Sequence, residues 1–124
     1  MKKGVKISAV DSKRVFRGTG YYDTEALNDL KQLVKECAKK YGNAVGFKFK
    51  DKEGRVTGRT FAEFDRHIDC LGTALISLGL KDAHISIISE NRYEWSVCYY
   101  SIVNGTGVAV PLDKHLPQAE VENL

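Results

Sequence analysis

The chain has 124 residues, an apolar fraction of 43% and a formal net charge of +3. These values are typical of one globular domain. No apolar run approaches the roughly 20 residues of a membrane span, so we expect no transmembrane segment.

Three cysteines, Cys37, Cys70 and Cys98, each lie on an apolar helical stripe. Their wide spacing matches no metal-binding pattern, and an odd number cannot pair completely. We therefore predict buried, reduced thiols, which favour a reducing compartment and a cytoplasmic location.

Residues 1–22 lack a clear periodicity and are predicted to form a loose basic N-terminal arm. Its positive residues are Lys2, Lys3, Lys6, Lys13, Arg14 and Arg17, opposed only by Asp11. Such an arm can contact nucleic acid or anionic lipid, but a solvated terminus is the commoner case. No aromatic residues alternate with the lysines, so we expect no nucleic-acid partner.

A helix is predicted to open at Thr24 and to end at Gly42-Asn43. Its apolar residues recur at helical spacing and are Leu27, Leu30, Val34, Cys37 and Tyr41. Residues 44–50 then alternate between apolar and polar, residues 51–54 form a turn, and residues 55–59 return. This pattern predicts a β-hairpin with one wet face.

The next helix is predicted to start at Thr60, with Glu63 completing a capping box, and to stop at Gly79. Its apolar stripe comprises Phe61, Phe64, Ile68, Leu71, Leu75 and Leu78. Gly72 lies inside this helix at a cost of about 1 kcal/mol relative to alanine, which indicates close packing against a neighbour.

Residues 85–88, 93–104 and 108–113 read as strand, helix and strand, with Gly105-Thr106-Gly107 ending the helix. This order predicts a right-handed βαβ unit with parallel strands, and therefore an α/β fold. The helix is apolar on nearly all sides, which is typical of a helix buried on nearly all sides. We expect more apolar surface here than the chain alone can cover.

Ser89, Glu90, Asn91 and Arg92 are the only candidate ligand contacts, because they follow a parallel strand where open α/β sheets bind ligands. A structural alternative is that Asn91 and Glu94 form a second capping box. Arg92 would then pair with Glu90, Glu94 or a further segment.

No catalytic, cofactor-binding or metal-binding residue is assigned. The chain has no phosphate-binding loop, dinucleotide fingerprint or nucleophile elbow. His67, His84 and His115 stand alone, and the glycine-rich turn at 105–107 precedes a strand rather than a helix.

Two segments resemble the core motifs of adenylate-forming enzymes. Residues 59–65 are similar to the first, a Thr-Tyr-x-Glu-Leu pattern in which Phe61 and Phe64 replace the usual Tyr and Leu. Residues 102–113 resemble the second, which ends in Val-Pro-Leu-Asp. Residues 71–75 and 90–95 are similar to the long-chain acyl-CoA synthetase branch.

This resemblance implies an enzyme that activates a carboxylic acid, expected to be a fatty acid, with ATP and magnesium and then transfers it to coenzyme A. Aryl-acid ligases and the adenylation domains of peptide synthetases share this scaffold and are the alternatives. Residues 23–124 would be the N-terminal part of the enzyme's AMP-binding domain, and the chain would stop before the ATP phosphate loop. We therefore expect the chain alone to be inactive and to pair with the rest of its parent synthetase. The alternative is a complete small α/β module that binds an anion or a partner at 89–92.

Overall fold

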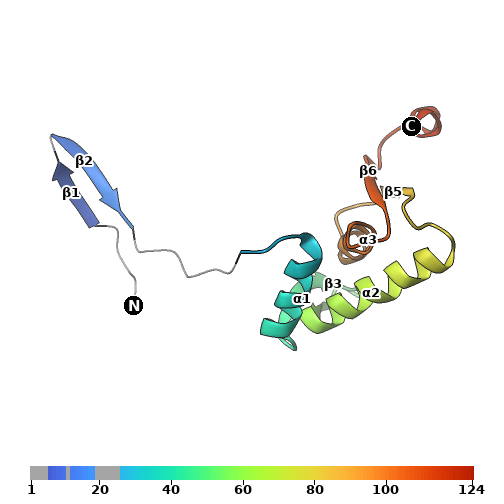
Figure 1. Cartoon of the computed structure of the whole chain (residues 1–124), viewed down its shortest axis with the longest axis horizontal. Helices are drawn as coiled ribbons and strands as arrows, with labels where there is room; N and C mark the ends of the chain where they lie inside the picture. Colours follow the sequence, from blue (N-terminus) through green and yellow to red (C-terminus); the bar gives the residue numbers. More distant parts are fainter. Residues whose placement is uncertain (1–5, 11, 19–25) are drawn as a thin grey trace.

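The computed structural model describes residues 6–10, 12–18 and 26–124. Within these ranges, three two-stranded sheets accompany four helices. In chain order (Figure 1) the elements are β1 (Lys6–Val10), β2 (Lys13–Arg17), α1 (Leu30–Tyr41), β3 (Val45–Lys50), β4 (Val56–Thr60), α2 (Phe61–Ser77), β5 (His84–Ile88), α3 (Tyr93–Val103), β6 (Val108–Leu112) and α4 (Gln118–Asn123).

The expectation of a loose arm is wrong for residues 6–10 and 13–17, which pair as an antiparallel hairpin with Lys6 opposite Arg17. Ser12 has a φ of 63° in the turn between the strands. The periodicity is hard to see because lysines and arginines are interspersed among a few β-branched residues. Residues 1–5, the rest of the arm after residue 18, and the boundary at residue 22 lie outside the described residues.

The first helix begins at Leu30, several residues later than predicted, and Thr24 lies outside the described residues. The Asp29 carboxylate accepts a hydrogen bond from the amide of Gln32 at 2.6 Å and so caps the helix. This cap decides the start, because an apolar residue at the right spacing, Leu27, cannot satisfy the free amides of the first turn. The predicted stop is confirmed, since Gly42 has a φ of 44°.

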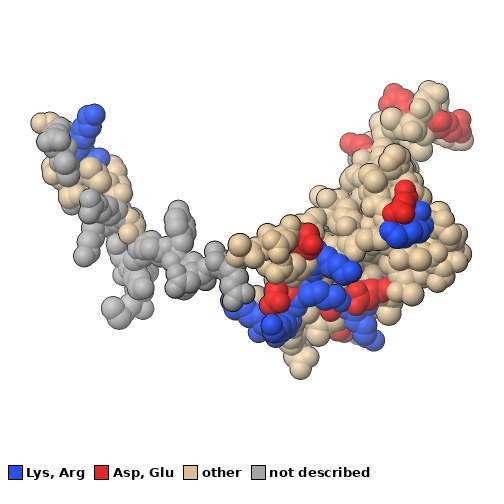
Figure 2. All heavy atoms as spheres, viewed as in Figure 1, with Lys and Arg blue, Asp and Glu red and all other residues tan. Residues whose placement is uncertain are grey.

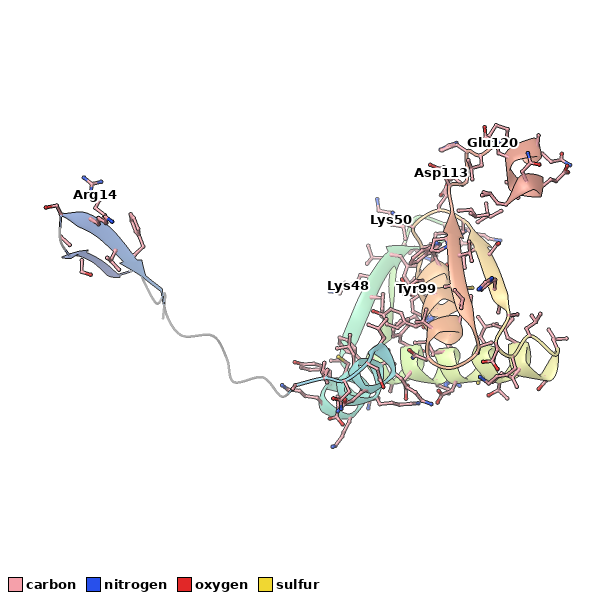
Figure 3. The ribbon with its side chains drawn as sticks, turned by 45° about the horizontal axis from the view of Figure 1, so that its top comes forward. Arg14, Lys48, Lys50, Tyr99, Asp113 and Glu120 are labelled. Atoms are coloured by element: carbon pink, nitrogen blue, oxygen red, sulfur yellow. The ribbon has the colours of Figure 1, made fainter. Side chains whose placement is uncertain are left out.

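Strands β3 and β4 form the predicted antiparallel hairpin. Phe47 and Phe49 turn toward the aromatic ring of Tyr93, with ring centroids 5.2 and 5.9 Å away. Lys48 and Lys50 project outward from the strand (Figure 3). The alternation read from the sequence thus gives one packed face and one wet face.

Helix α2 begins with the predicted capping box. Thr60 Oγ1 accepts from the Glu63 amide at 3.1 Å, while the Thr60 amide donates to Glu63 Oε2 at 2.8 Å. Because the charged carboxylate receives the Thr60 amide, the pKa of Glu63 is held below its ordinary value. Gly79, with a φ of 81°, follows the end of the helix as expected.

Gly72 confirms the predicted close approach between α2 and α3. A Cβ at this position would lie 3.3 Å from the Ser101 carbonyl oxygen and 3.4 Å from Thr106 Oγ1. The Ser101 hydroxyl donates to the Ile68 carbonyl at 3.1 Å, which joins the two helices at the same crossing.

Strands β5 and β6 pair in parallel, from His84 opposite Val108 to Ile88 opposite Leu112, with α3 as the crossover. The α/β fold class is therefore confirmed. A core of Val34, Phe64, Ile68 and Val97 joins α1, α2 and α3. Helix α3 contacts both strands of the sheet and also the two preceding helices.

The sheet and α3 are only partly covered by the described residues. In α3, Val97, Ser101 and Ile102 are buried, whereas the rest of its apolar side chains are half-buried. Ile88 and Val108 of the sheet are 47% and 50% exposed. This agrees with the expectation of surplus apolar surface in the βαβ unit.

The three cysteines are free thiols, but the prediction that all are buried is wrong. Cys70 is exposed because it lies off the apolar stripe of α2, and Cys37 and Cys98 are half-buried. Burial raises the pKa of the Cys98 thiol. None of the helices in the described ranges has the length and apolar character needed to cross a bilayer.

Candidate functional site: the strand-end hollow

Parallel pairing brings the carboxyl ends of β5 and β6 to the same edge of the sheet. A hollow of about 690 Å³ opens there, and Figure 3 shows Asp113 at this end of β6. We call it the strand-end hollow; its lining is Ser89, Glu90, Asn91, Trp95, Pro111, Leu112, Asp113, Lys114 and His115.

An ion pair links the two loops of this hollow. Lys114 Nζ donates to Glu90 Oε1 at 2.6 Å, which joins the loop after β5 to the loop after β6. The hydrogen bond from the Lys114 ammonium, together with its charge, lowers the pKa of the Glu90 carboxyl. The Lys114 and Glu90 side chains are 39% and 66% exposed, so the pair orients the loops more than it stabilises them.

The structure brings together three of the four predicted residues. Ser89, Glu90 and Asn91 line the strand-end hollow, and Ser89 Oγ donates to the Glu90 carbonyl at 3.1 Å. Arg92 instead lines a second hollow of about 390 Å³ beside Phe47, Phe49 and Tyr93.

Sequence reasoning missed Asp113, Lys114 and His115, which complete the lining. The signal was available, because residues after β6 must emerge at the same edge as residues after β5. The His115 amide donates to Asp113 Oδ1 at 2.8 Å, so this loop has its own local turn. The candidate site thus combines two loops rather than one.

The proposed second capping box at the start of α3 is wrong. The N-cap is Arg92, whose side chain makes no capping bond, and its Nε donates to Glu94 Oε2 at 3.2 Å. Glu94 is therefore engaged with Arg92, one of the partners expected for that arginine, and does not reach back to Asn91. One cause is that the helix starts one residue later than a capping box from Asn91 requires.

The charges around the hollow do not favour an anion. Glu90, Glu94 and Asp113 outnumber Lys114 and Arg92 among the charged residues of the two loops and the start of α3. Each of the two cations is already within hydrogen-bond distance of a carboxylate. A bound anion would have to displace one of these partners.

The glycine-rich turn at residues 105–107 does not fit a nucleotide phosphate. Thr106 is 2% exposed, and its hydroxyl donates to the Ser101 carbonyl at 2.9 Å. A Cβ at Gly107 would collide with the carbonyl oxygen of Ala83. Gly107 thus allows the start of β6 to approach the residue before β5 closely, and the Thr106 hydroxyl is already bonded.

The described residues also do not fit a magnesium site. No group of three His, Cys, Asp or Glu side chains lies close enough together in those ranges to hold a metal ion. The His67 ring is occupied structurally, with Nδ1 2.7 Å from the Tyr93 hydroxyl. No residue in the described ranges is therefore assigned to ATP, magnesium or coenzyme A.

Comparison with known proteins gives the fold and the family. The chain superposes on CmiS6, known from a crystal structure, with a TM-score of 0.68 and 11% identity, over 84% of this chain. It spans 28% of the length of CmiS6. In all, 24 chains of solved structures match, whereas no curated protein does. The family described as AMP-binding enzyme matches residues 34–124, well over half of the chain. The chain therefore belongs to the AMP-binding enzyme family, the adenylate-forming ligases.

Proposed function

We propose that the chain is the N-terminal scaffold portion of an ATP-dependent fatty-acid–CoA ligase. The observation that carries this proposal is the family match over residues 34–124. The long-chain branch is supported by the resemblance of residues 71–75 and 90–95 to that group. In the parent enzyme, acid and ATP would give an acyl-adenylate and pyrophosphate, and coenzyme A would then displace AMP.

The contacts of the two core motifs support a scaffold role. In the first motif, Thr60 and Glu63 cap α2 at its junction with β4. In the second motif, the amides of Thr106 and Gly107 donate to the Ile102 carbonyl at the end of α3, and Gly107 packs against Ala83, just before β5. The most characteristic residues are thus used to fix helix ends, and no nucleophile or acid–base pair is found among them.

ATP, magnesium and coenzyme A are proposed for the parent enzyme only, with the fatty acid as its substrate and the cytoplasm as its compartment. The rival proposal is a small binding module at residues 89–92. It gains no support from the charges there, since both cations of the site are paired with carboxylates.

The test is ATP–pyrophosphate exchange driven by a panel of acids. We expect exchange with a long-chain fatty acid for the complete enzyme and none for the 124-residue chain. Acetate, benzoate and amino acids serve as matched alternatives. Exchange with benzoate or an amino acid alone would contradict the fatty-acid assignment, and exchange by the chain alone would contradict the scaffold role.

A further inference from the structure

We propose that the β1–β2 hairpin docks on the anionic lipid headgroups of a membrane surface. This inference goes beyond the proposed function and does not depend on which acid the parent enzyme activates. Three features support it: the distribution of charge along the chain, the absence of close packing around the hairpin, and the side chains on one face of β2.

Positive charge is concentrated in the first 22 residues. This segment contains six lysines and arginines against a single acidic residue, Asp11, which gives a net charge of +5. Because the whole chain carries +3, residues 23–124 carry −2. The two parts of the chain therefore differ in sign, and neither β1 nor β2 contains an acidic residue. A segment of this kind is attracted to an anionic surface while the rest of the chain is not.

The hairpin is not covered by the rest of the described chain. Strands β1 and β2 pack against each other, and within the described ranges neither packs closely against a helix or another strand. Neither Lys13 nor Arg14 forms an ion pair with a described carboxylate. Figure 2 shows blue atoms without red ones on the hairpin, whereas blue and red are interspersed over α1 and α2. A lone two-stranded hairpin is marginally stable in water, so a surface that covers it also stabilises it.

One face of β2 carries both a cation and an aromatic ring. Arg14 and Phe16 share this face because they are two residues apart, and the small Ala9 lies opposite Arg14. Phe16 is 63% exposed, and Figure 3 shows Arg14 projecting outward from the strand. A guanidinium binds phosphate oxygens in bidentate fashion, and an exposed ring beside it can enter the apolar boundary below the headgroups. The face thus offers the two contacts of an interfacial anchor.

Two other kinds of partner fit this hairpin less well. Grooves for single-stranded nucleic acid use several aromatic rings for stacking, whereas Phe16 is the only aromatic residue in β1 and β2. Addition of a strand from another protein is discouraged by the lysine and arginine side chains of both strands. An anionic bilayer matches the charge and accepts the ring at the same time.

The experiment is cosedimentation of the 124-residue chain with vesicles. Vesicles of phosphatidylcholine alone are compared with vesicles of equal parts phosphatidylcholine and phosphatidylglycerol. We expect at least about tenfold tighter binding to the anionic vesicles, and we expect high salt to remove this difference. Binding to the neutral vesicles measures the contribution of apolar side chains exposed elsewhere in the chain. Equal binding to both kinds of vesicle would overturn the proposal.

A matched pair of double variants locates the binding surface. Lys13→Glu with Arg14→Glu reverses two charges on β2. Lys48→Glu with Lys50→Glu makes the same change in net charge on the exposed face of β3. Each cation near an anionic surface contributes about a fivefold factor, so the β2 variant should bind at least about 25-fold more weakly. The β3 variant should lose much less, and equal losses would assign the binding to overall charge and overturn the proposal.

A second matched pair tests the ring. Phe16→Ser and Val56→Ser both remove an apolar side chain from a hairpin strand, at positions that are 63% and 70% exposed. Phe16→Ser should weaken binding to the anionic vesicles by about fivefold, because it removes an apolar group that enters the interface. Val56→Ser should leave binding unchanged. Lys13→Arg with Arg14→Lys keeps both charges and should also bind like the unmodified chain.

The competing partner is tested with single-stranded RNA. If RNA binds more tightly than the anionic vesicles and displaces the chain from them, the hairpin is a nucleic-acid contact and the proposal is overturned. If RNA does not displace the chain, the lipid assignment stands. None of these measurements depends on catalysis, so failure of the proposed fatty-acid activity would leave the docking of the hairpin intact.

Discussion

The helical core around Phe64 and the β5–β6 sheet differ in how completely they are covered. Phe64 is 7% exposed and contacts Phe47 and Tyr100, at centroid distances of 4.6 and 5.6 Å. In contrast, Ile88 and Val108 on the sheet are about half exposed. Three helices and a hairpin are thus enough to cover the side chains around Phe64. Two strands and one crossover helix are not enough to cover both faces of the β5–β6 sheet.

Polar contacts strengthen this difference. Lys35 Nζ lies 2.8 Å from Asp65 and 2.6 Å from Asp69, so α1 and α2 are joined by charge as well as by packing. Burial opposes the charged ammonium, but hydrogen bonds to Asp65 and Asp69 outweigh it and raise the pKa of Lys35. Among the described residues, the two loops that follow β5 and β6 are joined by the Lys114–Glu90 pair.

Phe64→Ala should have the largest effect on stability, because it removes a side chain from the covered core. Removing this ring leaves a cavity between the hairpin and the helices, so we expect the free energy of unfolding to fall by about 3–5 kcal/mol. Urea unfolding followed by Trp95 fluorescence measures it. Leu78→Ala, on a side chain that is 75% exposed, is the control and should change stability by about 0.5 kcal/mol or less. Equal losses would show that no closed core exists.

Gly72→Val tests the crossing that joins the two regions. The first added carbon already lies 3.3 Å from the Ser101 carbonyl, so the branched side chain must separate α2 from α3. We expect a loss of about 1–3 kcal/mol in the same assay. Thr73→Val, at the exposed neighbouring position, should cost much less. A stabilised Gly72→Val would mean that the helices are not in contact there.

The Lys114–Glu90 pair gives a pH prediction for the sheet. The pKa of Glu90 is lower in the folded chain than in the unfolded chain. The ion pair therefore stabilises the folded chain at pH values above the unfolded pKa, and this stabilisation is lost as the pH falls through the folded pKa. Carbon-detected NMR titration should find this lowered pKa, and Lys114→Met should raise it toward its ordinary value. High salt should have the same effect in the unmodified chain. An unshifted Glu90 would contradict the pairing.

Thiol labelling is expected to change stability least, because it disturbs neither the helical core around Phe64 nor the β5–β6 sheet. Cys70 is exposed, whereas burial raises the pKa of Cys98 and reduces its thiolate fraction. We expect iodoacetamide to modify Cys70 first at pH 7.5, as read by peptide mass spectrometry. In denaturant the two rates should converge. Faster labelling of Cys98 in the folded chain would show that the side of α3 that carries Cys98 is open to solvent.

Local chemistry explains which parts of the fold were predictable. The Thr60–Glu63 capping box and the stop at Gly79 depend on residues close in sequence, and both were predicted correctly. The start of α1 was not, because the choice between Thr24 and Asp29 depends on which side chain reaches the free amides. Residues 6–17 were missed because short charged strands have no apolar stripe to reveal them.

The site was predictable only in part for a similar reason. Ser89, Glu90 and Asn91 follow a strand, and a strand end is visible in the sequence. Their neighbours Asp113 and Lys114 are more than twenty residues away along the chain. They join the site only because β5 and β6 pair in parallel and end together.

The amino-acid sequence by itself determined the order of helices and strands from α1 to β6, the α/β class and the excess of apolar residues in the last third of the chain. These follow from periodicity and capping, which act over a few residues. Only the tertiary structure decided that Arg92 turns to Glu94, that Cys70 faces solvent, and that the loops after β5 and β6 line one hollow. These outcomes depend on contacts between segments that are far apart in the sequence. Local periodicity and capping patterns carry no information about such contacts.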